Sequence, residues 1–297
     1  ISRDRILRVV PQSHSEWAEL AERANQSRVA PLLYQRLTSL LGVIDVPNEI
    51  RARLRGLYLH CAFRNARTYH ELEAALILLR QEKIPVIALK GAHLAEIVYG
   101  NIALRPMVDI DLLLRGTDTG RAKELLLGCG FIETGHDDHH LCLSKPSAHV
   151  VIEIHWSITS SNFPFRVETE SLWDRSESAR IAGVDVAVLS PEDLILHLCL
   201  HASYHHLFDT PLKYLCDITE AVRHHRERID WGLLSSMARR RGLARCTYFT
   251  LWCAKTTLAC EVPAGVLREL RPSDLDPSWM ESALHRVIRP EQGKNAP

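Results

Sequence analysis

The sequence predicts an α+β fold, in which a small mixed β-sheet is flanked by N-terminal and C-terminal helical regions. Apolar residues recur at helical spacing up to about Lys83, and helical periodicity returns after Ser190. Between these regions the apolar runs are short and of strand length, and several alternate with polar residues. We therefore expect an N-terminal helical region over residues 1–83, an α/β core over 84–190 and a C-terminal helical region over 191–297.

The N-terminal helices are predicted from three sets of apolar positions, each of which falls on one helix face. The sets are Trp17, Leu20 and Ala24; Leu54, Leu57, Tyr58 and Cys61; and Leu72, Ala75, Leu76 and Leu79. Pro31 and Pro47 separate these segments, because a proline inside a helix removes a backbone hydrogen bond.

The central part begins with a short apolar run, residues 84–89, which predicts a strand that ends at Lys90-Gly91 and is followed by a helix through Tyr99. Residues 108–114 alternate acidic and apolar side chains, the period of a strand with two different faces. The elements expected after it are a helix from Thr117 or Asp118 to about Leu127, two strands at His140–Leu143 and His149–His155 joined as a hairpin, and a second hairpin around Ile181–Leu189.

The C-terminal helices begin at Ser190-Pro191-Glu192-Asp193. Proline lacks an amide hydrogen that would be unpaired there, and acidic residues favour the helix dipole. His197, His201 and His205 then follow at i, i+4 and i+8 on one helix stripe. Such imidazoles could bind zinc, but a single ion usually takes only two of them, so zinc is the lesser interpretation and packing inside the protein is one alternative to it.

Composition excludes several classes of protein. The 297 residues carry 36 basic and 36 acidic side chains, so there is no broad positive surface of the kind that binds nucleic acid. Eight cysteines without a CxxC pair indicate neither a disulfide scaffold nor a zinc site, and they favour a reducing cytoplasm. We expect no membrane span and no secretory signal, because charges interrupt every long apolar stretch and the N-terminus lacks the signal pattern.

Asp109 and Asp111 are the first candidates for chemistry. Two carboxylates at i and i+2 on a strand lie on the same face, with Cα atoms about 7 Å apart, so both can reach a shared pair of divalent ions. Glu153 and His155 share a face of the strand at 149–155, and Glu153 offers the third carboxylate that a two-metal site usually needs. Taken alone, an Asp-x-Asp pair is more often a solvated strand edge, and glycosyltransferases use the same motif.

Lys90, Gly91 and Arg105 strengthen the interpretation of the acidic pair. Gly91 follows a strand, where its missing side chain allows a phosphate to approach backbone amides at a helix start. Lys90 supplies a positive charge for a polyphosphate, and Arg105 directly precedes the acidic strand. An exposed arginine paired with a local acid is the alternative for Arg105.

Three ordered segments resemble the uncharacterised nucleotidyltransferase family of the DNA polymerase beta-like nucleotidyltransferase superfamily. They are residues 89–94 with Tyr99-Gly100, residues 104–113, which read LRPMVDIDLL, and residues 153–156, which read EIHW. The helical segments 190–201 and 215–218 resemble the family's C-terminal part, so the resemblance covers about residues 70–225.

The resemblance implies a metal-dependent transfer of a nucleoside monophosphate from a nucleoside triphosphate, with ATP as the expected donor. Asp109, Asp111 and Glu153 would hold two Mg²⁺ or Mn²⁺ ions, while Lys90, Gly91, Arg105 and His201 would bind the nucleotide. The acceptor stays open: a small molecule is favoured, and a protein side chain and an RNA end are the alternatives.

The sequence departs from the superfamily at two places. Ala92 stands where the superfamily's Gly-Ser loop has a hydroxyl, so phosphate binding depends more on the backbone and on Lys90. Glu153 stands where an aspartate is commoner, which leaves open whether it is a base or a metal ligand.

Two further polar segments and two rival functions stay open. His136, His139 and His140 with Asp137 and Asp138 form a polar loop for which a metal role is the lesser interpretation. Residues 223–245 contain seven arginines and two acids, and a solvated helix face is favoured over RNA contact. The rival functions are a sugar transferase that uses a nucleotide sugar and a non-catalytic nucleotide-binding module.

Overall fold

The computed structural model describes residues 10–40, 42–276, 280, 282 and 284. The chain forms two compact units, and each has its own core. The first contains the chain up to Trp156 together with Ser178–Val188. The second contains Ser157–Glu177 together with the described chain from Leu189 onward.

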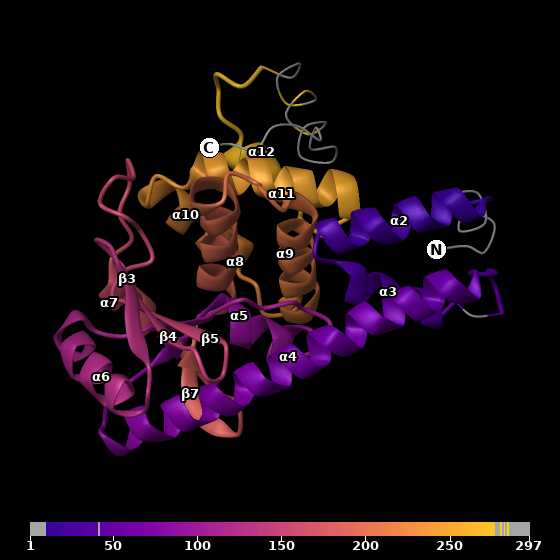
Figure 1. The fold of residues 1–297 in the computed structure, drawn as a ribbon. Helices are drawn as coiled ribbons and strands as arrows, with labels where there is room; N and C mark the ends of the chain where they lie inside the picture. Colours follow the sequence, from indigo (N-terminus) through magenta and orange to yellow (C-terminus); the bar gives the residue numbers. More distant parts are fainter. Residues whose placement is uncertain (1–9, 41, 277–279, 281, 283, 285–297) are drawn as a thin grey trace. The chain divides into compact units, whose positions relative to one another are not determined.

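Helices α2 (His14–Gln26), α3 (Ala30–Thr38) and α4 (Asn48–Gln81) open the first unit. A capping box starts α2, because the Ser13 side chain accepts from the Glu16 amide while the Glu16 side chain accepts from the Ser13 amide. The 34-residue helix α4 packs on α2 and α3 at one end and on β7 and α6 at the other. Figure 1 shows α4 running from the first helices past the sheet.

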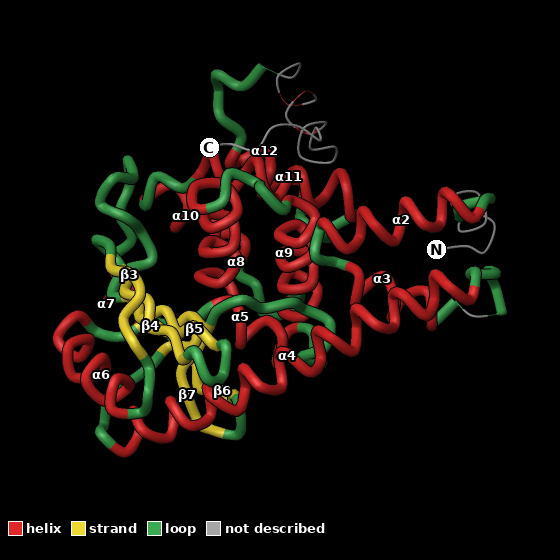
Figure 2. Tube along the Cα trace, viewed as in Figure 1, coloured by secondary structure: helices red, strands yellow, loops and turns green. Residues whose placement is uncertain are grey.

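Seven strands form one mixed sheet, which is drawn in yellow in Figure 2. The strands are β1 (Ile87–Ala88), β2 (Ile110–Leu113), β3 (Ile132–His136), β4 (His140–Lys145), β5 (Val150–His155), β6 (Glu177–Ile181) and β7 (Val184–Val188). Their order across the sheet is β3-β4-β5-β2-β1-β7-β6. The centre of the sheet is β2, which runs parallel to β5 and antiparallel to β1.

The first unit's core lies where α4 packs on the sheet. Leu72, Leu76 and Leu79 from α4 join the buried side chains of β1, β2 and β5 in one apolar cluster. All four residues of β2 are buried, as expected for a central strand covered on both faces. Helix α5 (Lys90–His93), the π-helical turn η1 (Leu94–Val98) and α6 (Gly116–Gly128) complete this unit.

The second unit is helical. Its helices are α7 (Thr169–Asp174), α8 (Pro191–Leu200), α9 (Pro211–His225), α10 (Trp231–Arg240), α11 (Ala244–Leu258) and α12 (Ala264–Leu270), with the π-helical turn η2 (His201–His205) after α8. Ser190 caps α8 by accepting from the Asp193 amide. The buried carboxylate of Asp193 forms ion pairs with Arg175 and Arg241, with an N–O distance of 2.7 Å in each.

The predicted fold class is confirmed: a mixed sheet lies between helical segments in the sequence. Both predicted hairpins form, as β4–β5 and β6–β7, and β3 is a strand that the sequence pattern did not indicate. The three-part division at residues 83 and 190 stays a prediction. No helix in the described part of the chain is both long and apolar enough to cross a bilayer.

Candidate active site

Asp111 and Glu153 meet at the centre of the sheet. Parallel pairing of β2 with β5 sets these two residues opposite each other, and their side chains therefore lie on one face. Asp111 is 1% exposed, whereas Glu153 is half-buried. The predicted juxtaposition of an acid from the Asp-x-Asp motif with Glu153 is present in the structure.

Lys90 lies against Asp111. Its Nζ is 2.8 Å from Asp111 Oδ1, and both side chains are buried. The backbone holds them together, because the Leu89 amide donates to the Asp111 carbonyl oxygen at 3.0 Å where β1 ends. The hydroxyl of Tyr69 on α4 donates a hydrogen bond to the Ala92 carbonyl oxygen at 2.8 Å and so ties α5 to α4.

His155 is the second basic side chain of this cluster. Its Nε2 is 3.2 Å from Asp111 Oδ1 and 3.3 Å from Glu153 Oε2, so the imidazole links the two carboxylates. Asp111, Glu153 and His155 each offer a ligand atom within 4.8 Å of the other two. Such a cluster of two carboxylates and one imidazole has the donor set of a divalent metal site.

The pKa values reflect a balance between burial and charge. Burial by itself would raise the pKa of Asp111, but the Lys90 charge and the His155 hydrogen bond outweigh it and hold this pKa well below its usual range. Burial would likewise lower the pKa values of Lys90 and His155, and both are nevertheless raised, chiefly because Asp111 stabilises their charged forms. Lys90 and Asp111 therefore form an ionised pair at neutral pH.

One oxygen of Asp111 is left open. Lys90 and His155 both contact Oδ1 of Asp111. Its other oxygen, Oδ2, is buried and has no hydrogen-bond partner among the described residues. A Cβ added at Gly91 would lie 3.7 Å from this oxygen and 3.4 Å from the Asp109 carbonyl oxygen. Glycine therefore keeps the space beside Asp111 free, as the sequence pattern predicts for an approaching phosphate or metal ion.

Asp109 and Arg105 occupy different surroundings. Asp109 directly precedes β2 and is half-buried. Arg105 is 6% exposed, so it is not the exposed arginine of the alternative interpretation. Its charge acts on Cys61 and Tyr69 of α4, although burial dominates and raises both of their pKa values. A contact between Arg105 and a nucleotide stays a prediction.

His139 and His140, for which a metal role was the lesser interpretation, lie next to His155. The β4–β5 register sets His140 opposite His155, and these two rings stack at 4.9 Å. Asp137 Oδ1 lies 3.0 Å from Nδ1 of both His139 and His140, which holds the two imidazoles against the carboxylate cluster. The hairpin turn at residues 145–147 was the available signal, because it fixes this register.

The remaining candidates belong to the second unit. His197 and His201 are buried, and the ring centroids of His201 and His205 are 5.7 Å apart. Burial is compatible with packing, and nucleotide binding by His201 stays a prediction. Among the arginines of residues 223–245, those paired with carboxylates are Arg223, Arg226, Arg228, Arg239, Arg241 and Arg245.

Comparison with known proteins supplies the family. Residues 13–259 match the family described as uncharacterised nucleotidyltransferase. The chain belongs to the uncharacterised nucleotidyltransferase family. This protein is therefore a nucleotidyltransferase, and its Lys90–Asp111 cluster lies in the segment that carries the family pattern. No curated protein matches the sequence.

Several solved structures share part of this nucleotidyltransferase's fold. The antibiotic-resistance factor ANT(2'')-Ia in solution is 17% identical with a TM-score of 0.42, and the match covers 54% of this chain and 84% of that one. The lincosamide antibiotic adenylyltransferase LnuA is 16% identical with a TM-score of 0.40, over 51% of this chain and 94% of that one. A nucleotidyltransferase-like protein from Paracoccidioides brasiliensis is 14% identical with a TM-score of 0.37, over 61% of this chain and 92% of that one.

Proposed function

We propose that this nucleotidyltransferase transfers a nucleoside monophosphate from a nucleoside triphosphate to an acceptor hydroxyl or phosphate and releases pyrophosphate. The reaction forms a bond between the acceptor oxygen and the α-phosphorus while the bond from that phosphorus to the bridging oxygen of pyrophosphate breaks. A hydroxyl acceptor loses its proton to a base or to water, whereas a phosphate acceptor reacts through an oxygen that is already ionised. ATP is the expected donor, and a divalent ion, Mg²⁺ or Mn²⁺, is the expected cofactor.

The observation that carries the proposal is the open oxygen of Asp111. A buried carboxylate oxygen without a partner is costly, and such atoms are usually satisfied by a group that the protein binds. Asp111 Oδ2 faces the space that Gly91 leaves free, and Glu153 lies beside it on the next strand. The carboxylates of Asp111 and Glu153 therefore support the proposal of a bound divalent ion, with Asp109 as the third predicted ligand.

A bound metal ion would neutralise negative charge on the phosphates. The protein's own groups do the positioning. Gly91 lets phosphate oxygens approach the start of α5, and Lys90 supplies a buried ammonium group for the polyphosphate. His155 holds Asp111 and Glu153 at fixed separation through its hydrogen bonds. Arg105 and His201 are the further predicted nucleotide contacts.

A small-molecule acceptor agrees with the charge distribution better than RNA does. The net charge is zero, and six arginines in the basic stretch at residues 223–245 are paired with acids. These arginines therefore do not offer the free positive charges that a phosphate backbone would need. The eight cysteines are free thiols, which supports the proposal that the protein works in the reducing cytoplasm.

The test is a thermal-shift screen of the four ribonucleoside triphosphates with and without Mg²⁺. We expect one triphosphate to raise the melting temperature by several degrees only when Mg²⁺ is present. Mass spectrometry of small-molecule extracts incubated with that triphosphate then seeks a product heavier by one nucleoside monophosphate.

Asp109→Asn is the primary variant, because Asp111→Asn also removes the partner of buried Lys90 and can destabilise the fold. Asp45→Asn is the matched control, since Asp45 is exposed on the loop before α4. Asp109→Asn should abolish product formation, and Asp45→Asn should retain it. Full turnover by Asp109→Asn would contradict the proposal.

A further inference from the structure

A cavity of about 270 Å³ lies among the N-terminal helices and next to the segment that leads into the catalytic strand. Its walls come from the α2–α3 turn, from α4 and from Pro106 and Val108. This volume suits a small metabolite rather than a nucleotide. Nothing in the proposed nucleotide chemistry uses this cavity.

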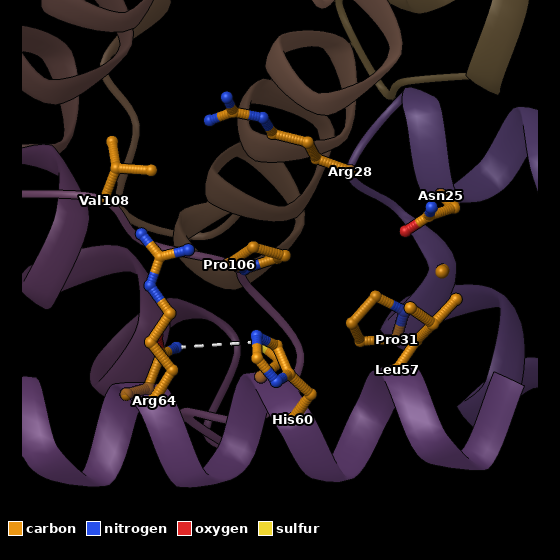
Figure 3. A pocket seen from close by; sticks show the side chains of 11 residues that line it. Asn25, Arg28, Pro31, Leu57, His60, Arg64, Pro106 and Val108 are labelled. Carbon is orange, nitrogen blue, oxygen red and sulfur yellow. Dashed lines mark hydrogen bonds between the residues drawn. The ribbon is translucent and has the colours of Figure 1, made fainter.

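The lining of the cavity is basic and apolar. Arg28, His60 and Arg64 contribute cationic or potentially cationic groups, and no acidic side chain lines the cavity. In Figure 3, Arg28 and Arg64 come from different elements, and their guanidinium groups extend toward the region beside Pro106 and Val108. In the described part of the chain, neither guanidinium has a carboxylate within ion-pair distance.

Asn65 gives a second and independent indication of a ligand. It is fully buried and lines the cavity, and its Nδ2 donates to the Arg105 carbonyl oxygen at 2.8 Å and also to the Ile102 carbonyl oxygen. These two donations fix the orientation of the amide. Asn65 Oδ1 is consequently a buried acceptor without a partner among the described residues. A ligand hydroxyl or amine would satisfy it.

The backbone at Arg28 agrees with a binding role. Arg28 has a φ of 57°, in the left-handed region that glycine occupies without penalty. The turn between α2 and α3 nevertheless carries a long cationic side chain at this position. Strained backbone of this kind is often found at binding sites.

The alternation of side chains before β2 connects the cavity with the catalytic strand. Pro106 and Val108 line the cavity, whereas Met107 lies on the Gly91 side, with its Sδ 3.5 Å from the position of a Cβ at Gly91. The backbone carbonyl oxygen of Asp109 also lies 3.4 Å from that position. One short segment therefore has the cavity on one side and the candidate phosphate site on the other.

We propose that this cavity binds a small organic anion, with a carboxylate or phosphate at Arg28 and Arg64, an apolar body against Leu57 and Pro106, and a donor group at Asn65. Arginine favours planar or tetrahedral oxyanions, because its guanidinium can donate two parallel hydrogen bonds. This site is separate from the one that binds the nucleotide, so both ligands can be bound at once.

The test measures binding of two probes, 4-hydroxybenzoate and phenyl phosphate, by ligand-observed NMR. The neutral amide 4-hydroxybenzamide serves as the charge control for the first probe. For a probe of this size we expect a dissociation constant on the order of 1 mM for at least one of the anions, and binding at least about tenfold weaker for the amide. Saturating ATP with Mg²⁺ should leave the anion bound.

Arg28→Gln and Arg64→Gln should each weaken binding of the anion about tenfold, whereas Arg55→Gln, on an exposed position of the same helix as Arg64, should not. Arg28→Gly should lose binding as well while its melting temperature stays unchanged or rises, which separates ligand contact from damage to the fold. The proposal is overturned if neither anion binds, if the amide binds equally well, if the glutamine variants bind normally, or if ATP displaces the probe. None of these results depends on whether nucleotide transfer is observed.

Discussion

Replacing Lys90 by methionine tests the electrostatic basis of the candidate active site. The substitution keeps the length of the side chain but removes the charge that lies 2.8 Å from Asp111 Oδ1. Asp111 is 1% exposed, so solvent cannot replace the lost partner. Removing one member of a buried ion pair costs about 3–5 kcal/mol. His155 still donates to Asp111 at 3.2 Å, and we therefore expect the lower end, about 3 kcal/mol.

A double-mutant cycle isolates the pair from the rest of the cluster. Asp111→Asn leaves the Lys90 ammonium buried, although the charges of Asp109 and Glu153 also act on it. We expect the Lys90→Met/Asp111→Asn double variant to lose less free energy of unfolding than the two single variants lose together. The difference, the coupling energy, should be about 2 kcal/mol. Lys123→Met is the matched control, because Lys123 pairs with Glu133 at a partly exposed site. Its loss should cost less than about 1 kcal/mol.

The assay is urea unfolding at pH 7 in the presence of EDTA, followed by circular dichroism. Hydrogen exchange of the Leu89 amide, which donates to the Asp111 carbonyl oxygen, gives a local measurement from the same unit. Addition of Mg²⁺ should then restore stability to Lys90→Met, because the metal ion and the Lys90 ammonium group both neutralise the Asp111 carboxylate. Additive single and double losses, or a cost for Lys90→Met no larger than that of the control, would refute the electrostatic reasoning.

Three other substitutions follow from the structure. Gly91→Ala should leave stability within about 1 kcal/mol, since its Cβ makes ordinary contacts, yet lower nucleotide transfer about 10- to 100-fold by occupying the space beside Asp111. Asp193→Ala should destabilise the second unit by about 3 kcal/mol in urea, because it leaves Arg241 and Arg175 without their buried carboxylate. Burial, assisted by neighbouring positive charges, lowers the pKa of His225 to about 4, so its contribution to stability is present above about pH 6.5 and is lost as the pH falls toward 4. Between pH 6.5 and pH 4, the free energy of unfolding should fall by about 2 kcal/mol less for His225→Gln than for the unsubstituted protein. If the two free energies depend equally on pH, the effect does not come from His225.

The strands that carry the acidic residues could be predicted because their periodicity is strong. The alternation at residues 108–114 predicted the strand that carries Asp111, although the strand is shorter and leaves Asp109 just before it, and the turn at residues 145–147 indicated the hairpin. The same turn pairs Lys145 with Val150 and therefore His140 with His155. The contact between these imidazoles was thus implicit in the sequence, although the periodicity of each strand taken alone does not reveal it.

Strand β3 could not be predicted from periodicity. Four of its five residues are exposed, so it has no buried face to produce an alternating pattern. Its register with β4 also shifts between Glu133 and Gly135, which breaks the period further. An edge strand of this kind forms because the neighbouring strand, here β4, offers unpaired backbone groups. The sequence of β3 alone therefore does not predict it.

The residues on α4 that support the site were missed for another reason. Tyr69 and Asn65 hold the Ala92 and Arg105 carbonyl oxygens over sequence separations of 23 and 40 residues. Helical periodicity predicts only that such side chains face inward. Which carbonyl oxygen each one reaches depends on how α4 packs on the sheet, and no local pattern specifies that packing.

The neutral charge of the chain has a local counterpart in the active site. Asp111 can be buried because Lys90 and His155 both contact its Oδ1, and their charges offset the cost of removing a carboxylate from water. The same arrangement leaves Oδ2 open beside Gly91. The site is therefore stabilised by the protein's own cations before any ligand arrives, and Lys90 is already positioned where a polyphosphate would compete with Asp111 for its ammonium group.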